Sequence, residues 1–157
     1  MHEPQALCLC HLMRARQIRP IAICLFRHGE RLLVSEGFDA AKQSYFCRPL
    51  GGGIEFGETS HAAVLREIEE EIGAAIENLR LVGVLENIFM YEGQRGHEIV
   101  FVYDAEFVDK TLYEQAEIIC CEVGVADRFQ AVWRSLAEME KNKTRLVPEG
   151  LVELLTA

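Results

Sequence analysis

The segment GGGIEFGETSHAAVLREIEEEIG, which covers residues 51–73, begins with three glycines, and four of its six glutamates, at 67, 69, 70 and 71, fall within one expected helix. Like charges three and four residues apart on a helix repel each other, at a cost of roughly 0.2–0.5 kcal/mol per pair. A bound cation would turn this repulsion into attraction. Because the available ligands are oxygens only, the cluster predicts a site for a hard divalent cation, Mg²⁺ first and Mn²⁺ second.

Three of these carboxylates share one face of the expected helix when its residues are placed at ~100° intervals. They are Glu67, Glu70 and Glu71. Glu69 points elsewhere, toward solvent. An apolar face occupies the neighbouring arc and is expected to pack on the core; its members are Leu65, Ile68 and Ile72.

The residues around this helix suit the same chemistry. Glycines 51–53 let the backbone approach a ligand closely, and their carbonyls are further candidate oxygen ligands. Arg66 lies beside Glu70 on the wheel and can reach back to Glu58 with a charge-assisted hydrogen bond, which would hold the loop against the helix. Arg48, just before the glycines, is either a phosphate-binding residue or one half of a surface ion pair.

The expected elements that position these residues are mostly extended. The helix is expected to begin after an N-cap at Thr59 or Ser60 and to end at Ile72, with Gly73 as a left-handed cap. Strands are expected at 18–26, 31–36, 47–56, 79–89, 97–107 and 129–133, loops at 37–46 and 108–126, and short helices near 135–141 and 148–155, the last with Pro148 at its start. Strands mixed with few helices, without βαβ alternation, predict an α+β fold.

The spacing Gly52-x5-Glu58-x7-Arg66-Glu67-Ile68-x-Glu70-Glu71-x-Gly73 resembles the signature box of the Nudix hydrolases. Ala74 stands where that family prefers a larger aliphatic residue. The resemblance extends over residues 18–155 and implies an α/β/α sandwich around a central mixed sheet. It implies metal-dependent hydrolysis of a nucleoside diphosphate linked to another group, with a small-molecule substrate. By position, the implied metal ligands are Gly52, Glu67, Glu70 and Glu71, and Arg66 and Glu58 form the supporting pair.

The general base and the substrate stay open at this point. Glu67 is the first choice for the base within the box, and Glu98 is favoured outside it, at the start of a strand expected beside the site. Glu117 and Glu122 are further candidates. His97 and Tyr91 are candidate substrate contacts: His97 adjoins that strand, and Tyr91 lies where some relatives carry a base-stacking tyrosine. No secondary sequence motif identifies the group that is attached to the diphosphate.

Composition and net charge limit the classes of partner and the cellular compartment that the sequence allows. The chain has 157 residues and a net charge of −9, which argues against a nucleic-acid polymer or an anionic membrane as partner. No apolar run approaches the ~20 residues of a membrane span. The N-terminus lacks the pattern of a secretory signal, so the six cysteines are expected to be reduced and the protein cytoplasmic. Residues 1–17 are expected to be an N-terminal appendage that is partly disordered, and 18–157 a single Nudix hydrolase domain.

Three function hypotheses follow. The favoured one is a Mg²⁺-dependent pyrophosphohydrolase. The second is a nucleotide-binding regulatory module of the same fold that does not cleave its ligand, although such modules often lose box carboxylates and this sequence keeps all of them. The third is a zinc protein built on Cys8, Cys10 and His11, for which no second ligand pair stands at zinc-finger spacing. A homodimer is common in such folds and stays an open alternative.

Overall fold

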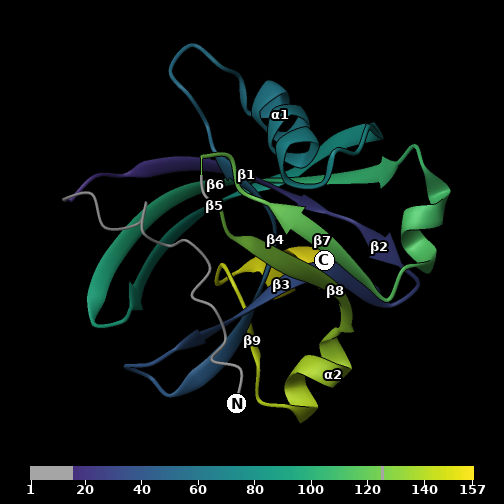
Figure 1. The fold of residues 1–157 in the computed structure, drawn as a ribbon. Helices are drawn as coiled ribbons and strands as arrows, with labels where there is room; N and C mark the ends of the chain where they lie inside the picture. The colour runs from purple at the N-terminus through teal and green to yellow at the C-terminus, as the bar shows by residue number, and fades with distance from the viewer. Residues whose placement is uncertain (1–15, 125) are drawn as a thin grey trace.

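The computed structural model describes residues 16–124 and 126–157. Its centre is a mixed sheet in the order β5-β6-β1-β4-β3-β8-β7, with β2 added on β3 and β9 added on β4 (Figure 1). β1 runs parallel to β6, and β9 runs parallel to β4; the other pairs are antiparallel. The strands are β1 (Arg19–Leu25), β2 (Arg27–His28), β3 (Arg31–Asp39), β4 (Ser44–Gly53), β5 (Ile76–Tyr91), β6 (Gln94–Phe107), β7 (Glu117–Cys121), β8 (Arg128–Ser135) and β9 (Arg145–Leu146).

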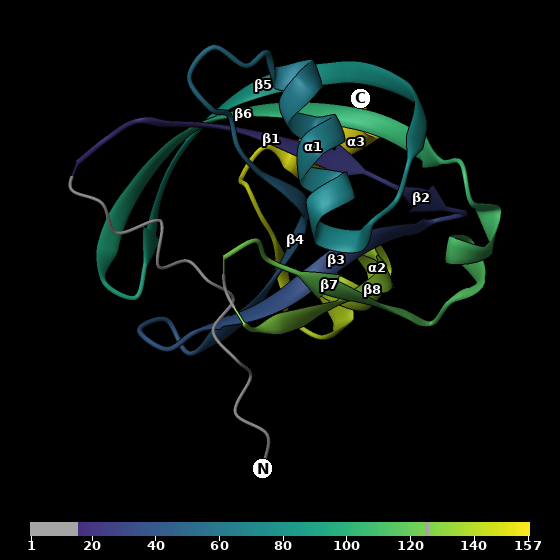
Figure 2. The ribbon, with the colours of Figure 1, turned by 45° about the horizontal axis from the view of Figure 1, so that its top comes forward.

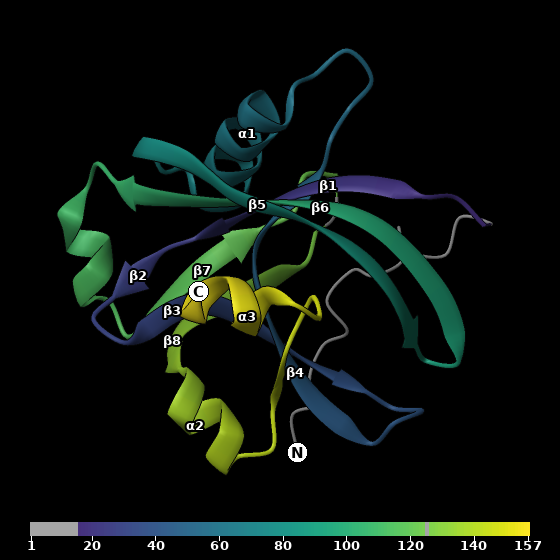
Figure 3. The ribbon, with the colours of Figure 1, turned by 180° about the vertical axis from the view of Figure 1, so that it is seen from behind.

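Three α-helices of the described residues cover the two faces of this sheet. α1 (Ser60–Ile72) lies on one face, and α2 (Leu136–Lys141) and α3 (Leu151–Thr156) lie on the other (Figures 2 and 3). A 3₁₀ helix, η2 (Lys110–Glu114), joins β6 to β7. This arrangement confirms the predicted α+β fold and the α/β/α sandwich. In the described residues no helix is long and apolar enough to cross a bilayer.

The central strand β1 explains why both faces need cover. Its alternate side chains enter two separate cores: Ala22 and Cys24 pack toward α1, whereas Ile21, Ile23 and Leu25 pack toward the face of α2 and α3. A strand buried on both sides reads as a continuous apolar run rather than an alternating one. Its neighbour β4 changes partner along its length, pairing with β3 up to Pro49 and with β1 from Leu50, so its last residues emerge beside α1.

The predicted loops at 37–46 and 108–126 are wrong. In the first segment β3 continues to Asp39 and β4 begins at Ser44, and the ring of Phe46 lies over Gly37, its cross-strand partner. Aromatic cover of this kind compensates for a glycine in a strand. The second segment contains η2 and the missed strand β7, whose five residues alternate between exposed and buried over too short a stretch to stand out.

The C-terminal prediction needs a smaller correction. Two helices follow β8, as predicted, and the first has a capping box between Ser135 and Glu138. The second begins at Leu151 after Gly150, so Pro148 precedes the helix and does not start it. The short strand β9 between them was not predicted, because two residues carry no periodicity.

Candidate active site

The glutamate-bearing helix α1 begins and ends where its sequence predicts. The Thr59 side chain accepts a hydrogen bond from the Ala62 N–H, and Gly73 adopts the left-handed conformation, with its N–H donated to the Glu69 carbonyl. Ile68 is fully buried, but Leu65 is 39 % exposed, so the predicted apolar face is wrong at that position. The core contacts come instead from Ala63 and Val64, whose shorter side chains allow α1 to sit close to the sheet.

Arg66 connects α1, through its hydrogen bonds, to the glycine-rich end of β4 (residues 51–53). Its guanidinium donates two hydrogen bonds to Glu58, at 2.7 and 2.8 Å, and one to the Gly53 carbonyl at 2.9 Å. Its Nη1 also donates to Glu67 at 3.0 Å and to Glu70 at 3.1 Å. Planar, forked geometry of this kind is available to arginine and not to lysine. The structure thus brings together Arg66 and Glu58, as the sequence predicts.

The Arg66–Glu58 pair gives a pH-dependent contribution to stability. The hydrogen bond from Arg66 lowers the pKa of Glu58 from 4.5 to about 2. A carboxyl whose folded pKa is depressed stabilises the fold above its unfolded pKa, and this stabilisation is lost as the pH falls from about 4.5 through about 2.

We therefore expect Glu58→Gln to lower the free energy of unfolding at pH 7, with a difference from the unmutated protein that shrinks as the pH approaches 2. Urea denaturation at a series of pH values measures this difference. Glu55→Gln is the matched control, since Glu55 is exposed and lies 3.9 Å from Arg66. A difference that stays constant between pH 7 and pH 2.5 would rule out the pair as its source.

Two glycines of β4 are required by close packing. A Cβ built on Gly52 would lie 2.5 Å from the Glu67 carboxylate, and one built on Gly51 would lie 2.1 Å from the Ala22 carbonyl oxygen. Gly51 also has a φ of 142°, which side chains of L-residues rarely adopt. At Gly53 the nearest atom would be 4.0 Å away. The first two glycines therefore serve different purposes: Gly51 lets β4 sit on β1, and Gly52 leaves room for Glu67.

Burial changes the electrostatics of two carboxylates on α1. Loss of hydration raises the pKa of Glu67, and it raises that of Glu71 to about 8, with the nearby Glu67 charge adding to the effect. Glu71 Oε2 is buried and has no hydrogen-bond partner among the described residues. Such an orphaned acceptor is costly, and a cation would satisfy it.

These residues fit a hard divalent cation. The donors are all oxygens: the three carboxylates and the carbonyls of the glycine strand. Within residues 16–124 and 126–157 no three acidic, histidine or cysteine side chains already converge as a metal cluster. In this structure the Nη1 of Arg66 donates to both Glu67 and Glu70. The unpartnered Glu71 oxygen is the feature that a cation would complete.

The carboxylates face a cavity of about 390 Å³, here called the glutamate pocket. It is lined by Glu67, Glu70 and Glu71 from α1, by glycines 51–53 and Arg48 from β4, and by Glu122 just after β7. The guanidinium of Arg48 makes no hydrogen bond or ion pair with a described residue, and its charge partly opposes the rise that burial causes in the pKa values of Glu67 and Glu71. Glu122 was a minor candidate in the sequence, because the strand that carries it to the site was not recognised.

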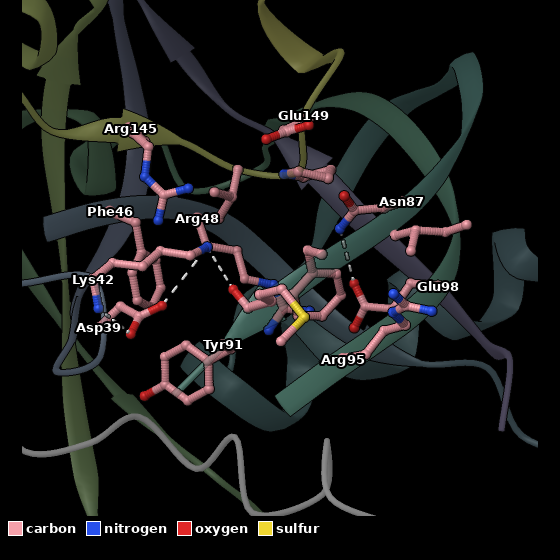
Figure 4. A pocket seen from close by; sticks show the side chains of 15 residues that line it. Asp39, Lys42, Phe46, Arg48, Asn87, Tyr91, Arg95, Glu98, Arg145 and Glu149 are labelled. Carbon is pink, nitrogen blue, oxygen red and sulfur yellow. Dashed lines mark hydrogen bonds and ion pairs between the residues drawn. The ribbon is translucent and has the colours of Figure 1, made fainter. Parts of the chain in front are cut away.

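A second cavity of about 430 Å³, here called the hairpin pocket, lies between the β5–β6 hairpin, β4 and the 145–149 segment. It contains Tyr91 and Glu98, and Arg48 lines both pockets (Figure 4). Glu98 therefore does not join the three carboxylates of α1. His97, its neighbour on β6, lines a third cavity with Arg19 and Arg95.

Other sequence candidates lie away from both pockets. Glu117 begins β7 and lines neither of them. Cys8, Cys10 and His11 fall outside the described residues. Of the cysteines that are described, Cys24, Cys47 and Cys120 are buried and Cys121 is exposed, and all four are free thiols. Sequence reasoning missed Asn87, a buried residue of the hairpin pocket, because β5 carries several other polar residues and nothing in the sequence sets this one apart.

A profile of the NUDIX domain matches residues 16–154, which is most of the chain. The chain belongs to the NUDIX family. This confirms the resemblance seen in the sequence and the prediction of a Nudix hydrolase, a family that generally uses divalent metals. The match includes the whole Nudix box, from Gly52 to Gly73, and the residues that line both pockets.

Solved structures share this Nudix fold. A NUDIX hydrolase from Nitrosomonas europaea superposes with a TM-score of 0.61 at 14 % identity, covering 89 % of this chain and 87 % of that one. A MutT NUDIX hydrolase from Burkholderia pseudomallei superposes with a TM-score of 0.61 at 24 % identity, covering 89 % and 98 %. At these identities the likeness establishes the fold.

Sequence relatives include the NAD-capped RNA hydrolase NudC of Pectobacterium carotovorum, which is 38 % identical over 78 residues. The NudC of Pectobacterium atrosepticum gives the same identity over the same length. The match covers 48 % of this chain and 29 % of each relative, so the chain spans less than a third of the curated relatives it matches.

Proposed function

We propose that this Nudix protein hydrolyses a pyrophosphate bond in a nucleoside diphosphate linked to another group, and that the reaction depends on Mg²⁺, with Mn²⁺ as a substitute. The observation that carries the proposal is the buried Glu71 Oε2, which has no hydrogen-bond partner among the described residues and lies in the same pocket as Glu67, glycines 51–53 and the Arg48 guanidinium. Such a site costs folding energy unless it binds something charged.

In this proposal Glu67, Glu70, Glu71 and the Gly52 carbonyl hold the cation. When bound, the cation neutralises charge on the diphosphate oxygens and lowers the pKa of the attacking water. Glu67 is the general base, because its carboxylate lies in the glutamate pocket against Gly52, whereas Glu98 lies in the hairpin pocket. It takes the proton of the attacking water. Arg48 binds a phosphate oxygen, and Arg66 and Glu58 keep α1 and β4 in register.

The two pockets divide the substrate between them. The diphosphate occupies the glutamate pocket, and one flanking group extends past Arg48 into the hairpin pocket, where Tyr91 contacts it. The proposed substrate is a small molecule rather than a nucleic-acid polymer, because the net charge of −9 opposes polyanion binding. The proposed compartment is the cytoplasm. His97 lines the third cavity, so in this proposal it contacts the substrate only if the substrate extends into that cavity.

A substrate panel tests this function. With Mg²⁺ we expect release of a nucleoside monophosphate from at least one of NADH, a diadenosine polyphosphate, a nucleotide sugar and a nucleoside triphosphate, measured by liquid chromatography. NADH is included because the NudC relatives carry NAD-capped RNA in their names. Excess EDTA should abolish the release, since the metal supplies the charge compensation. Tight binding of a nucleotide without any cleavage would favour the regulatory-module alternative instead.

A further inference from the structure

The hairpin pocket contains a buried polar pair that the proposed reaction does not use. Asn87 of β5 and Glu98 of β6 are directly opposed across the two strands and are 6 % and 5 % exposed. Asn87 Nδ2 donates to Glu98 Oε2 at 3.5 Å, and Figure 4 shows the two side chains together in the pocket. Burial of an amide beside a carboxylate is costly unless both are well hydrogen-bonded.

Glu98 is poorly satisfied by the protein. Its one hydrogen bond is at the 3.5 Å limit, and its other oxygen forms an ion pair with Arg19 Nη1 at 3.9 Å, which is too long for a hydrogen bond. An ionised carboxylate offers about four acceptor positions. Most of the acceptor capacity of Glu98 is therefore directed at the pocket. Asn87 adds a donor beside it, because its amide has a second N–H besides the one given to Glu98.

The pocket around this pair suits a flat ring. Phe89 and Tyr91 follow Asn87 at alternate positions of β5, and Phe46 of β4 meets Tyr91 edge to face, with ring centroids 5.9 Å apart. A base in the pocket would contact aromatic faces or edges there. The cavity volume of about 430 Å³ lies within the range of small-ligand sites.

Hydrogen bonds hold the pocket walls together at the far end. Asp39 is 1 % exposed, and its Oδ1 accepts from the Ala41 and Lys42 N–H groups of one hairpin and from the Glu92 N–H of the other. The Lys42 ammonium also donates to the Met90 carbonyl. The β3–β4 and β5–β6 hairpins are thus tied across the opening, so the pair stands in a preformed cavity.

Resting on the function proposed above, we propose that Asn87 and Glu98 read a guanine base, so that the substrate is a guanosine diphosphate derivative. The guanine edge presents two adjacent donors, N1–H and the 2-amino group, next to the O6 acceptor. The donors match the two oxygens of Glu98, and O6 matches the free N–H of Asn87. Adenine, cytosine and uracil each place a ring acceptor or carbonyl against the carboxylate, and a carboxamide such as that of nicotinamide leaves one carboxylate oxygen without a donor.

Binding without catalysis tests this assignment. Calorimetric titration in EDTA, where the proposed hydrolysis cannot proceed, compares GDP, IDP, ADP and NAD⁺. We expect GDP to bind at least ~10-fold more tightly than IDP, which lacks only the 2-amino group, and more tightly than ADP or NAD⁺, because a site built for a donor discriminates against the analogue without it. Equal binding of GDP and IDP, tighter binding of ADP or NAD⁺, or no binding of any of the four would overturn the assignment.

Variants locate the source of the preference. Glu98→Gln keeps the shape but presents at most one acceptor oxygen, so the GDP affinity should fall at least ~10-fold and the GDP-to-IDP ratio should approach one. Glu86→Gln is the matched control, an exposed carboxylate beside Asn87 on the same strand, and should bind as the unmutated protein does. A Glu98→Gln protein that keeps the GDP preference contradicts the proposal. If Glu98→Gln does not fold, the comparison of GDP with IDP binding to the unmutated protein still tests the guanine assignment.

The outcomes separate the two proposals. Cleavage of panel compounds without any preference for guanine would remove the base assignment and leave the hydrolase in place. A clear preference for GDP, without cleavage of any guanosine diphosphate derivative in Mg²⁺, would remove the hydrolase and leave the base assignment in place.

Discussion

Replacing Glu71 by glutamine is expected to lower kcat by on the order of a hundredfold to a thousandfold, because the variant loses a charged ligand that compensates negative charge building in the transition state. Glu70→Gln should have an effect of the same kind. Neither change should unfold the protein. Glu71 is a desolvated carboxylate with an unpartnered oxygen, so a neutral amide of the same size removes a burial cost. The melting temperature without metal should therefore stay equal or rise.

Steady-state kinetics on the best panel substrate, together with thermal melting in EDTA, measures both effects. Glu69→Gln is the matched control: it lies in the same run of glutamates but is exposed on the other side of α1. It should retain the activity of the unmutated protein. Full activity in Glu71→Gln, or an equal loss in Glu69→Gln, would contradict the assignment of the metal ligands.

The second large effect is expected from alanine substitutions in the glycine strand. Gly51→Ala should destabilise the fold by on the order of 3 kcal/mol, because its Cβ would meet the backbone of β1 and its φ of 142° is strained for alanine. Gly52→Ala should leave the fold largely intact but lower kcat by on the order of a hundredfold, since its Cβ would displace the Glu67 side chain.

Gly53→Ala provides the control for both, because the nearest atom to its Cβ lies 4.0 Å away and no backbone strain is involved. Urea denaturation and kcat, measured on the three variants in parallel, separate the roles. Three equal losses of stability would indicate that the strand tolerates no side chain at all. An active Gly52→Ala protein would show that Glu67 does not need its position against the strand.

The sequence predicted the acidic face of α1 because its signals are local. Caps at Thr59 and Gly73 and the spacing of the three carboxylates depend on residues within one helix, and the structure reproduces them. The Arg66–Glu58 contact also follows from chain proximity across one short loop. Leu65 was misplaced because a helical wheel gives the spacing of apolar side chains and not which of them contact the sheet.

The hairpin pocket could not be predicted from local sequence signals of this kind. It is built from β4, the β5–β6 hairpin and the 145–149 segment, which meet only through sheet order. The parallel pairing of β1 with β6 fixes the position of Glu98 opposite Arg19, and neither residue shows this in the sequence. Glu98 was therefore expected beside the box carboxylates, and the structure places it in the neighbouring pocket, reached past Arg48.

The central claim is that Glu67, Glu70 and Glu71 share a divalent cation, and a crystal soaked in Mn²⁺ tests it most directly. Anomalous scattering from manganese should give a peak bounded by these three carboxylates, with Glu71 Oε2 and the Gly52 carbonyl within about 2.3 Å of it. The peak should be absent in Glu71→Gln crystals. A Mn²⁺-soaked crystal with no peak there, and with Arg66 still bonded to Glu67 and Glu70, would contradict the account.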